Sequence, residues 1–173
     1  MMRSQLFFPF FAHPVSTYDT RLEAALTRLV AKHFDICEER VESPNKPEHE
    51  EGYRLWAHSG DASLMNYFHE MVFPECDGVV ALPFLDGRMG IDVADSTQWF
   101  VKVGLPVFII NTAGEVTPVS LRHFETNCHC TLFYLRQMTE EEGSLVVAND
   151  PRVVIPYREC PEYYPLPDRQ SVQ

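Results

Sequence analysis

Several features that would assign the chain to a broad class are missing. No apolar run among its 173 residues approaches the roughly 20 residues that a membrane-spanning helix needs. The segment "LFFPFFA" is too short, and no basic region or small-residue cleavage site accompanies it, so we expect no signal peptide. Basic residues are scarce, since 14 Lys and Arg face 25 Asp and Glu. The net charge of −11 argues against nucleic-acid polymers as partners, because phosphates need a basic stripe.

Cysteine and nucleotide-binding motifs are equally sparse. The five cysteines are an odd number, so we expect no disulfide framework and a cytoplasmic location. "CHC" at 128–130 has only His123 nearby and no second ligand pair, so we expect no metal site there. The GxGxxG and GxxxxGK[ST] patterns are absent, which excludes a Rossmann dehydrogenase and a P-loop NTPase. The sequence therefore predicts no cofactor.

Apolar periodicity predicts alternating strands and helices. Thr20 and Glu23 have the spacing of a capping box at the start of the first helix. A polar segment, 42–63, is rich in turn formers and is predicted to be a long loop. The strands are predicted at 5–11, 34–41, 77–84 and 106–111, and the helices at 16–34, 64–73 and 91–103. This alternation is typical of an α/β fold with a parallel sheet and right-handed crossovers.

The pattern is less regular after Thr112. We expect a further strand at 129–135, a short helix at 139–147, and a tail rich in Pro and Tyr that wraps the surface or a partner subunit. The whole chain, 1–173, is predicted to be a single domain, with 112–173 as a less regular C-terminal extension.

Ligands of open parallel sheets bind at the carboxyl ends of the strands. Three turns are expected at that edge: "FAHPVSTYDT", "LPFLDGRMGID" and "INTAG". The second turn and the helix after it carry three aspartates, Asp86, Asp92 and Asp95. Asp92 and Ser96 are spaced i, i+4, so they share one face of the predicted helix. Short acidic side chains at a helix start can be ligands or nucleophiles, or they can be caps and first-turn charges with no further role.

Four segments resemble the nucleoside 2-deoxyribosyltransferase superfamily: "FFAHPVS", the "SPN…H…Y" loop, "YFHEMVFPECD" and "CDGVVALPFLDGRMG…GLPVFII". The resemblance covers about residues 5–111. It implies a flavodoxin-like (Rossmann-like) parallel sheet flanked by helices in three αβα layers. It also implies cleavage or transfer of an N-glycosidic bond in a nucleoside or nucleotide, through a helix-borne glutamate that attacks the anomeric carbon. Relatives are oligomers that complete sites across subunits, so a homo-oligomer is expected.

The chain departs from this family at the nucleophile. Counting back from the "LPV" strand, the glutamate position falls on Ser96, so Asp92 or Asp95 would have to be the nucleophile. Asp86 would hold the sugar or assist the base. Phe10 stands where the family often has a tyrosine hydroxyl. The substrate-binding residues carried over by the resemblance are Phe10, Ala12, His13, Pro14, Gly87, Arg88, Gly90 and Ser96.

Alternative functions remain open at this point. The chain could be a nucleoside-binding module that has lost the chemistry, or an assembly protein with an acidic surface. His13 could contact a ligand or be structural, and Asp77 is interpreted as structural. The basic residues that could bind a 5′-phosphate at this edge are Arg88 and Arg21. Because there are only these two, an unphosphorylated nucleoside is favoured as the ligand. The aromatic and histidine side chains of the predicted loop could close over a base, although packing is favoured: His49, Tyr53, Trp56 and His58.

Overall fold

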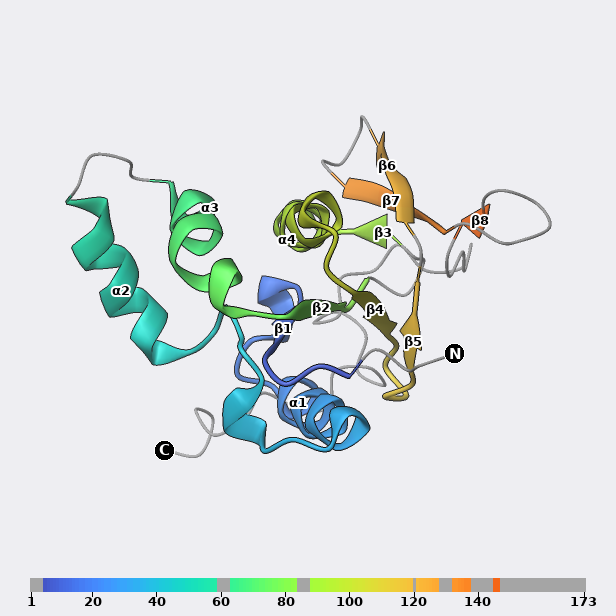
Figure 1. The fold of residues 1–173 in the computed structure, drawn as a ribbon, viewed down its shortest axis with the longest axis horizontal. Helices are drawn as coiled ribbons and strands as arrows, with labels where there is room; N and C mark the ends of the chain where they lie inside the picture. The colour runs from blue at the N-terminus through green and yellow to red at the C-terminus, as the bar shows by residue number, and fades with distance from the viewer. Residues whose placement is uncertain are drawn as a thin grey trace.

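The structure is a computed structural model, which describes residues 5–58, 63–83, 88–119, 121–127, 132–137 and 145–146 (Figure 1). Its central sheet has four strands in the order β1-β2-β4-β5. Strands β1 (Pro9–Ala12), β2 (Gly78–Ala81) and β4 (Val107–Ile110) are parallel, and β5 (Val116–Pro118) is antiparallel to β4. This mostly parallel sheet with its helices agrees with the predicted α/β class.

A second sheet is wholly antiparallel. It has the order β3-β7-β6. Strand β3 pairs with Phe133 and Tyr134 of β7, and β8 pairs with the end of β7, at Arg136 and Gln137. The strands are β3 (Arg88–Met89), β6 (Leu121–Asn127), β7 (Leu132–Gln137) and β8 (Leu145–Val146). Strand β7 lies partly within the predicted strand 129–135, whose first three residues are outside the described chain. The short helix expected at 139–147 is contradicted at its end, where β8 is a strand.

The three parallel strands are buried along their whole length, which is why their sequences are continuously apolar. Side chains alternate between two core clusters. Phe11, Val80 and Phe108 pack against helix α1 (Arg21–Phe34) on one face. Phe10 and Val79 belong to the cluster on the opposite face, which includes buried residues of α3 and α4. Figure 1 shows α1 below the sheet and α3 and α4 above it.

The helix predicted at 91–103 is confirmed as α4, whereas the one predicted at 16–34 begins later, since α1 starts at Arg21 after its capping-box residue. Thr20 is the N-cap of α1, and its side chain accepts a hydrogen bond from the main-chain N–H of Glu23. The Glu23 carboxylate accepts from the N–H of Asp19, one residue earlier than an ideal capping box requires. Helix α4 (Ile91–Val103) ends at Gly104, whose φ of 76° lies in the left-handed region that favours glycine.

The strand predicted at 34–41 is wrong. Helix α1 continues to Phe34, and the polar segment that follows contains a 3₁₀ turn, η2 (Glu38–Arg40), with no buried residue. Among the described residues, Glu42 alone pairs with this edge of β1, as an isolated parallel bridge to Phe10. The Glu42 N–H donates to Pro9 O at 2.9 Å, and Phe11 N–H donates to Glu42 O at 2.8 Å.

The loop predicted at 42–63 is also wrong, because it contains helix α2 (Pro47–Ala57). Pro47 occupies the first turn, where its missing N–H costs nothing, and acidic Glu48 and Glu50 favour the helix start. Its only buried residue is His49, so the sequence shows no apolar stripe. The predicted helix 64–73 is confirmed and is longer, since α3 (Leu64–Tyr67) continues through a π turn, η3 (Phe68–Val72), into a 3₁₀ turn, η4 (Phe73–Glu75). Across the described part of the chain, no helix combines the length and apolar character needed to cross a membrane.

Candidate functional site

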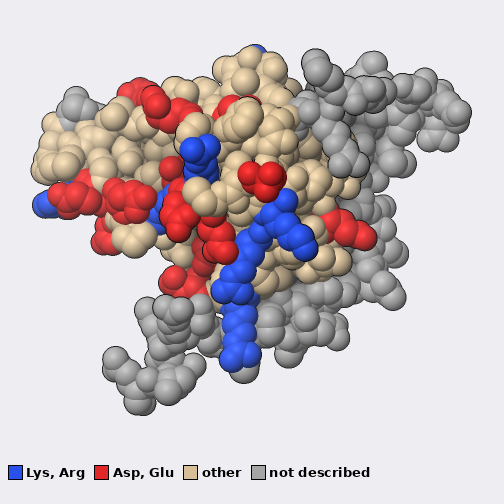
Figure 2. All heavy atoms as spheres, turned by 60° about the horizontal axis from the view of Figure 1, so that its bottom comes forward, with Lys and Arg blue, Asp and Glu red and all other residues tan. Residues whose placement is uncertain are grey.

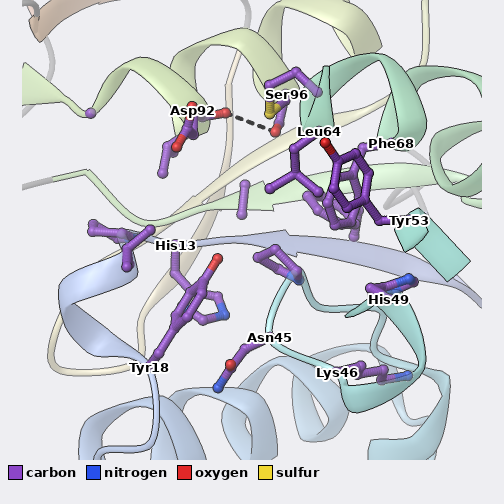
Figure 3. A pocket seen from close by; sticks show the side chains of 18 of the residues that line it. His13, Tyr18, Asn45, Lys46, His49, Tyr53, Leu64, Phe68, Asp92 and Ser96 are labelled. Carbon is purple, nitrogen blue, oxygen red and sulfur yellow. Dashed lines mark hydrogen bonds between the residues drawn. The ribbon is translucent and has the colours of Figure 1, made fainter. Parts of the chain in front are cut away.

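A cavity of about 680 Å³ lies at the carboxyl end of β1. Its wall is formed by the turn after β1, the segment that leads into α2, the facing sides of α2 and α3, and the first turns of α4 (Figure 3). Apolar and aromatic side chains predominate, with a few polar groups among them. Size and lining are those of a small-molecule site.

Most of the residues predicted for the site line this cavity. The seven are Phe10, Ala12, His13, Pro14, Gly90, Asp92 and Ser96. Asp95 does not line it. Asp86 and Gly87 lie outside the described residues. Arg88 pairs through its backbone with Tyr134 of β7, but its side chain lies outside the described part of the structure.

Asp92 presents a carboxylate to the cavity from the first turn of α4 (Figure 3). It does not cap the helix, because the N-cap is Gly90 and no side chain closes that end. Within the described residues its carboxylate has no hydrogen-bond or ion-pair partner. Partial burial, and then the negative charge of Asp95, raise its pKa above the usual aspartate value. The residue is exposed and lies at the helix N-terminus, whose field favours the ionised form, so its side chain is open to a ligand.

Ser96 and Asp95 lie one turn further along α4 and differ in orientation. The Ser96 hydroxyl donates to the main-chain oxygen of Asp92 at 2.8 Å, so the two residues share a face as predicted. Asp95 Oδ2 lies 2.7 Å from His69 Nε2, and the His69 ring packs on Phe73 at 5.4 Å. Asp95 therefore joins α4 to η3 instead of facing the cavity.

Both ring nitrogens of His13 form hydrogen bonds within the protein. Its side chain is buried, with Nδ1 2.7 Å from Thr17 Oγ1 and Nε2 3.1 Å from Ser43 Oγ. Because the Thr17 hydroxyl donates to Pro14 O at 2.7 Å, it accepts from His13 Nδ1–H, and Nε2 accepts from Ser43. Burial lowers the pKa of His13 to about 3, so the ring is neutral. It holds the turn after β1 in place, which is the structural alternative that the sequence left open.

Tyr18 is a site residue that the sequence did not single out. It follows the 3₁₀ turn η1 (Val15–Thr17), and its ring packs edge-on to His13 at 5.1 Å. Figure 3 shows its hydroxyl directed into the cavity, and no side chain or main-chain group of the described residues hydrogen-bonds to it. Burial, followed by the charges of Asp92 and Glu23, raises the pKa of the phenol, so it stays protonated. The sequence signal that could have identified Tyr18 is its position, as an aromatic residue in the turn at the carboxyl end of the first strand.

The α2 wall contributes His49, Glu50 and Tyr53, which depend on a helix that the sequence did not predict. His49 Nε2 lies 2.7 Å from Glu42 Oε1 and its Nδ1 lies 3.2 Å from the Tyr67 hydroxyl. Burial opposes ionisation of Glu42, but the hydrogen bond from His49 and the charge of Lys46 outweigh it and lower the pKa of Glu42. His49 thus joins α2 to α3 and to the segment beside β1, while Trp56 and His58 do not line the cavity.

No group of three or more His, Cys, Asp or Glu side chains in the described residues is arranged to hold a metal ion. The "CHC" segment lies outside those residues. Comparison with family models, with curated proteins and with solved structures gives no match to this chain.

Proposed function

We propose that this protein breaks the N-glycosidic bond of a nucleoside, as a hydrolase or transferase, with Asp92 as the nucleophile. The observation that carries the proposal is a carboxylate without a partner among the described residues, on the first turn of a helix, facing a cavity of about 680 Å³. That volume accommodates a nucleoside. The resemblance of residues 5–111 to nucleoside 2-deoxyribosyltransferases supplies the substrate class.

The strand arrangement supports the flavodoxin-like, three-layer form of the fold. Glu42 pairs with one edge of β1, and β2 pairs with the other. The chain therefore moves first to one side of β1 and then to the other. Such a reversal of strand order is where open α/β sheets bind their ligands, at the carboxyl ends of the strands. The cavity lies at the carboxyl end of β1.

The chemistry assigned to the site has two steps. An Asp92 oxygen attacks the anomeric carbon, the carbon–nitrogen bond breaks, and the base leaves with the bonding electrons and takes a proton from water. The resulting glycosyl ester then reacts with water, which gives the free sugar, or with a second base, which gives a new nucleoside. In either case the attacking group loses a proton to the solvent and the Asp92 carboxylate is restored. The Tyr18 hydroxyl, which stays protonated, would donate a hydrogen bond to the sugar during both steps.

The charge around the site favours a nucleoside over a nucleotide. Lys46 is the basic residue of the described cavity wall, and its ammonium lies 3.7 Å from Glu42 Oε1 and donates to Glu39 O. Figure 3 shows that this ammonium points away from Asp92. Figure 2 shows Asp and Glu side chains spread over the face that it presents, with Lys and Arg in one long band and a few separate places. Arg21 does not line the cavity.

The second candidate is a nucleoside-binding module without catalysis. Two observations favour it. Ser96, at the family's glutamate position, uses its hydroxyl for a main-chain hydrogen bond, and Asp95 is engaged by His69. Asp92 would then be the one carboxylate left to act as nucleophile. Its side chain is one methylene shorter than that of the family glutamate, and a misplaced nucleophile reacts more slowly.

A base-release assay tests the proposal. The protein is incubated with a panel of nucleosides, with and without an acceptor base, and the free base is followed by chromatography. We expect Asp92→Asn to lower release by more than about 10³-fold, since a nucleophile is lost. The matched control, Asp95→Asn on the same helix, should keep most of the activity. Release that persists in Asp92→Asn would refute this nucleophile, and thermal stabilisation by a nucleoside without release would establish the binding module.

A further inference from the structure

The polar side chains around the cavity have used most of their hydrogen-bond donors inside the protein. Both ring nitrogens of His13 are bonded, to Thr17 and Ser43, and both nitrogens of His49 are bonded, to Glu42 and Tyr67. The single hydroxyl hydrogen of Ser96 goes to the main chain. The Lys46 ammonium is directed at Glu42 and Glu39. These groups have little left to donate to a ligand.

Acceptors, in contrast, remain available. The Asn45 amide nitrogen donates to Asp19 at 3.2 Å and to Glu23 at 3.1 Å, which leaves the amide oxygen for a ligand. Asp92 and Glu50 are exposed residues of the cavity wall, and neither carboxylate has a hydrogen-bond or ion-pair partner among the described residues. The exceptions are the Tyr18 hydroxyl, which can donate or accept, and the first N–H groups of α4, whose positive field the Asp92 carboxylate opposes.

The cavity also has two different ends. Asp92 and Tyr18 lie on facing walls at one end of the cavity, and Tyr53, Phe68 and Leu64 lie at the other end (Figure 3). Glu50 and Tyr53 are three residues apart on α2, so they share a helix face toward this second end. Aromatic rings suit the flat face of a base, and a carboxylate beside them suits a donor on its edge.

We infer that the α2–α3 end binds a nucleobase with an exocyclic amino group, and that Glu50 accepts a hydrogen bond from that group. The inference rests on the proposed function for the identity of the ligand as a nucleoside. Adenosine and cytidine present an amino group where inosine and uridine present a carbonyl oxygen. A carbonyl facing Glu50 would place two acceptors together and leave both unpaired, which disfavours the oxo base.

Calorimetric titration of the matched pairs adenosine and inosine, and cytidine and uridine, tests this inference. The Asp92→Asn variant is used, so that the ligand is not consumed. We expect the amino member of each pair to bind about tenfold more tightly or better. Adding Glu50→Gln should bring the two members together, because a glutamine amide can donate to the carbonyl. The control is Glu48→Gln, on the same helix but outside the cavity wall, and it should keep the preference.

Equal affinities within each pair, or a preference that survives Glu50→Gln, would overturn the inference. Base release by the wild-type protein, measured in parallel, separates it from the proposed function. Selective binding without release would support the role of Glu50 and contradict catalysis. Release without selectivity would support catalysis and overturn the role of Glu50. Failure of all four nucleosides to bind would overturn it as well.

Discussion

The neutral, buried state of His13 predicts a specific dependence of stability on pH. The perturbation is a fall in pH from 7 to 4.5, with His13→Gln as the comparison variant. In the unfolded chain the histidine protonates near pH 6.5, whereas burial lowers its pKa in the folded protein to about 3. The unfolded state therefore binds more protons over this window, and stability is lost as pH falls through 6.5.

The magnitude follows from the two pKa values. Stability falls by about 1.4 kcal/mol per pH unit between them, which gives about 3 kcal/mol at pH 4.5. The Glu23 carboxylate lies 3.5 Å from His13 Nε2 and favours the protonated ring, so the loss is reduced. We expect about 2–3 kcal/mol from His13 alone.

The assay is urea unfolding of the wild type and of His13→Gln at pH 7, 6, 5 and 4.5. Carboxylates titrate in both proteins, so the difference between the two curves isolates His13. The wild type should lose stability relative to the variant as pH falls. A constant difference would refute the reasoning, as would an NMR titration in which the His13 ring of the folded wild type protonates near pH 6.5.

Three further predictions concern other parts of the molecule. Asp77→Ala should lower the free energy of unfolding by about 1–2 kcal/mol in urea titration, because its carboxylate accepts two main-chain N–H groups near the amino terminus, at 2.6 and 3.0 Å; Asp77→Asn should lose less, and equal losses would contradict this. Gly52→Ala should destabilise by about 1–3 kcal/mol, since a Cβ there would lie 2.3 Å from the Tyr67 hydroxyl oxygen. The double variant with Tyr67→Phe should recover part of that loss, and no recovery would show that another contact is responsible. Asp92→Asn should raise stability at pH 7 by less than about 1 kcal/mol, because the raised pKa of Asp92 makes its ionisation unfavourable in the folded state. The gain should vanish below about pH 3.9, where the carboxyl is protonated in both states, and a gain that persists there would have a different cause.

The elements that could be predicted from sequence have strong local signals. Helix α1 has a Thr20 cap and an apolar stripe, and α4 has glycines at both ends, Gly90 and Gly104. Helix α2 could not be predicted from periodicity, since it buries His49 alone and is preceded by turn formers. The short run 34–37, "FDIC", suggested the core of a strand, but helix α1 includes Phe34 and the charged η2 turn follows Cys37.

Some residues of the candidate site could likewise be predicted from local sequence signals, and others could not. Asp92 and Ser96 could be placed at the cavity because they follow a buried strand at the start of a predicted helix. The structural role of His13 could not be predicted, because Ser43, which bonds to its Nε2, lies 30 residues away in sequence. Glu50 joins the cavity only because α2 folds over it, so its position depends on tertiary structure.

The central claim, that Asp92 forms a covalent bond to the sugar, can be tested by intact-protein mass spectrometry. The protein is incubated with a 2-fluoro-substituted nucleoside, which slows breakdown of a glycosyl ester, and the labelled peptide is then sequenced. The account predicts a mass increase of one fluorinated sugar on Asp92, and none in Asp92→Asn. Base release without any label, or a label on a different residue, would contradict it.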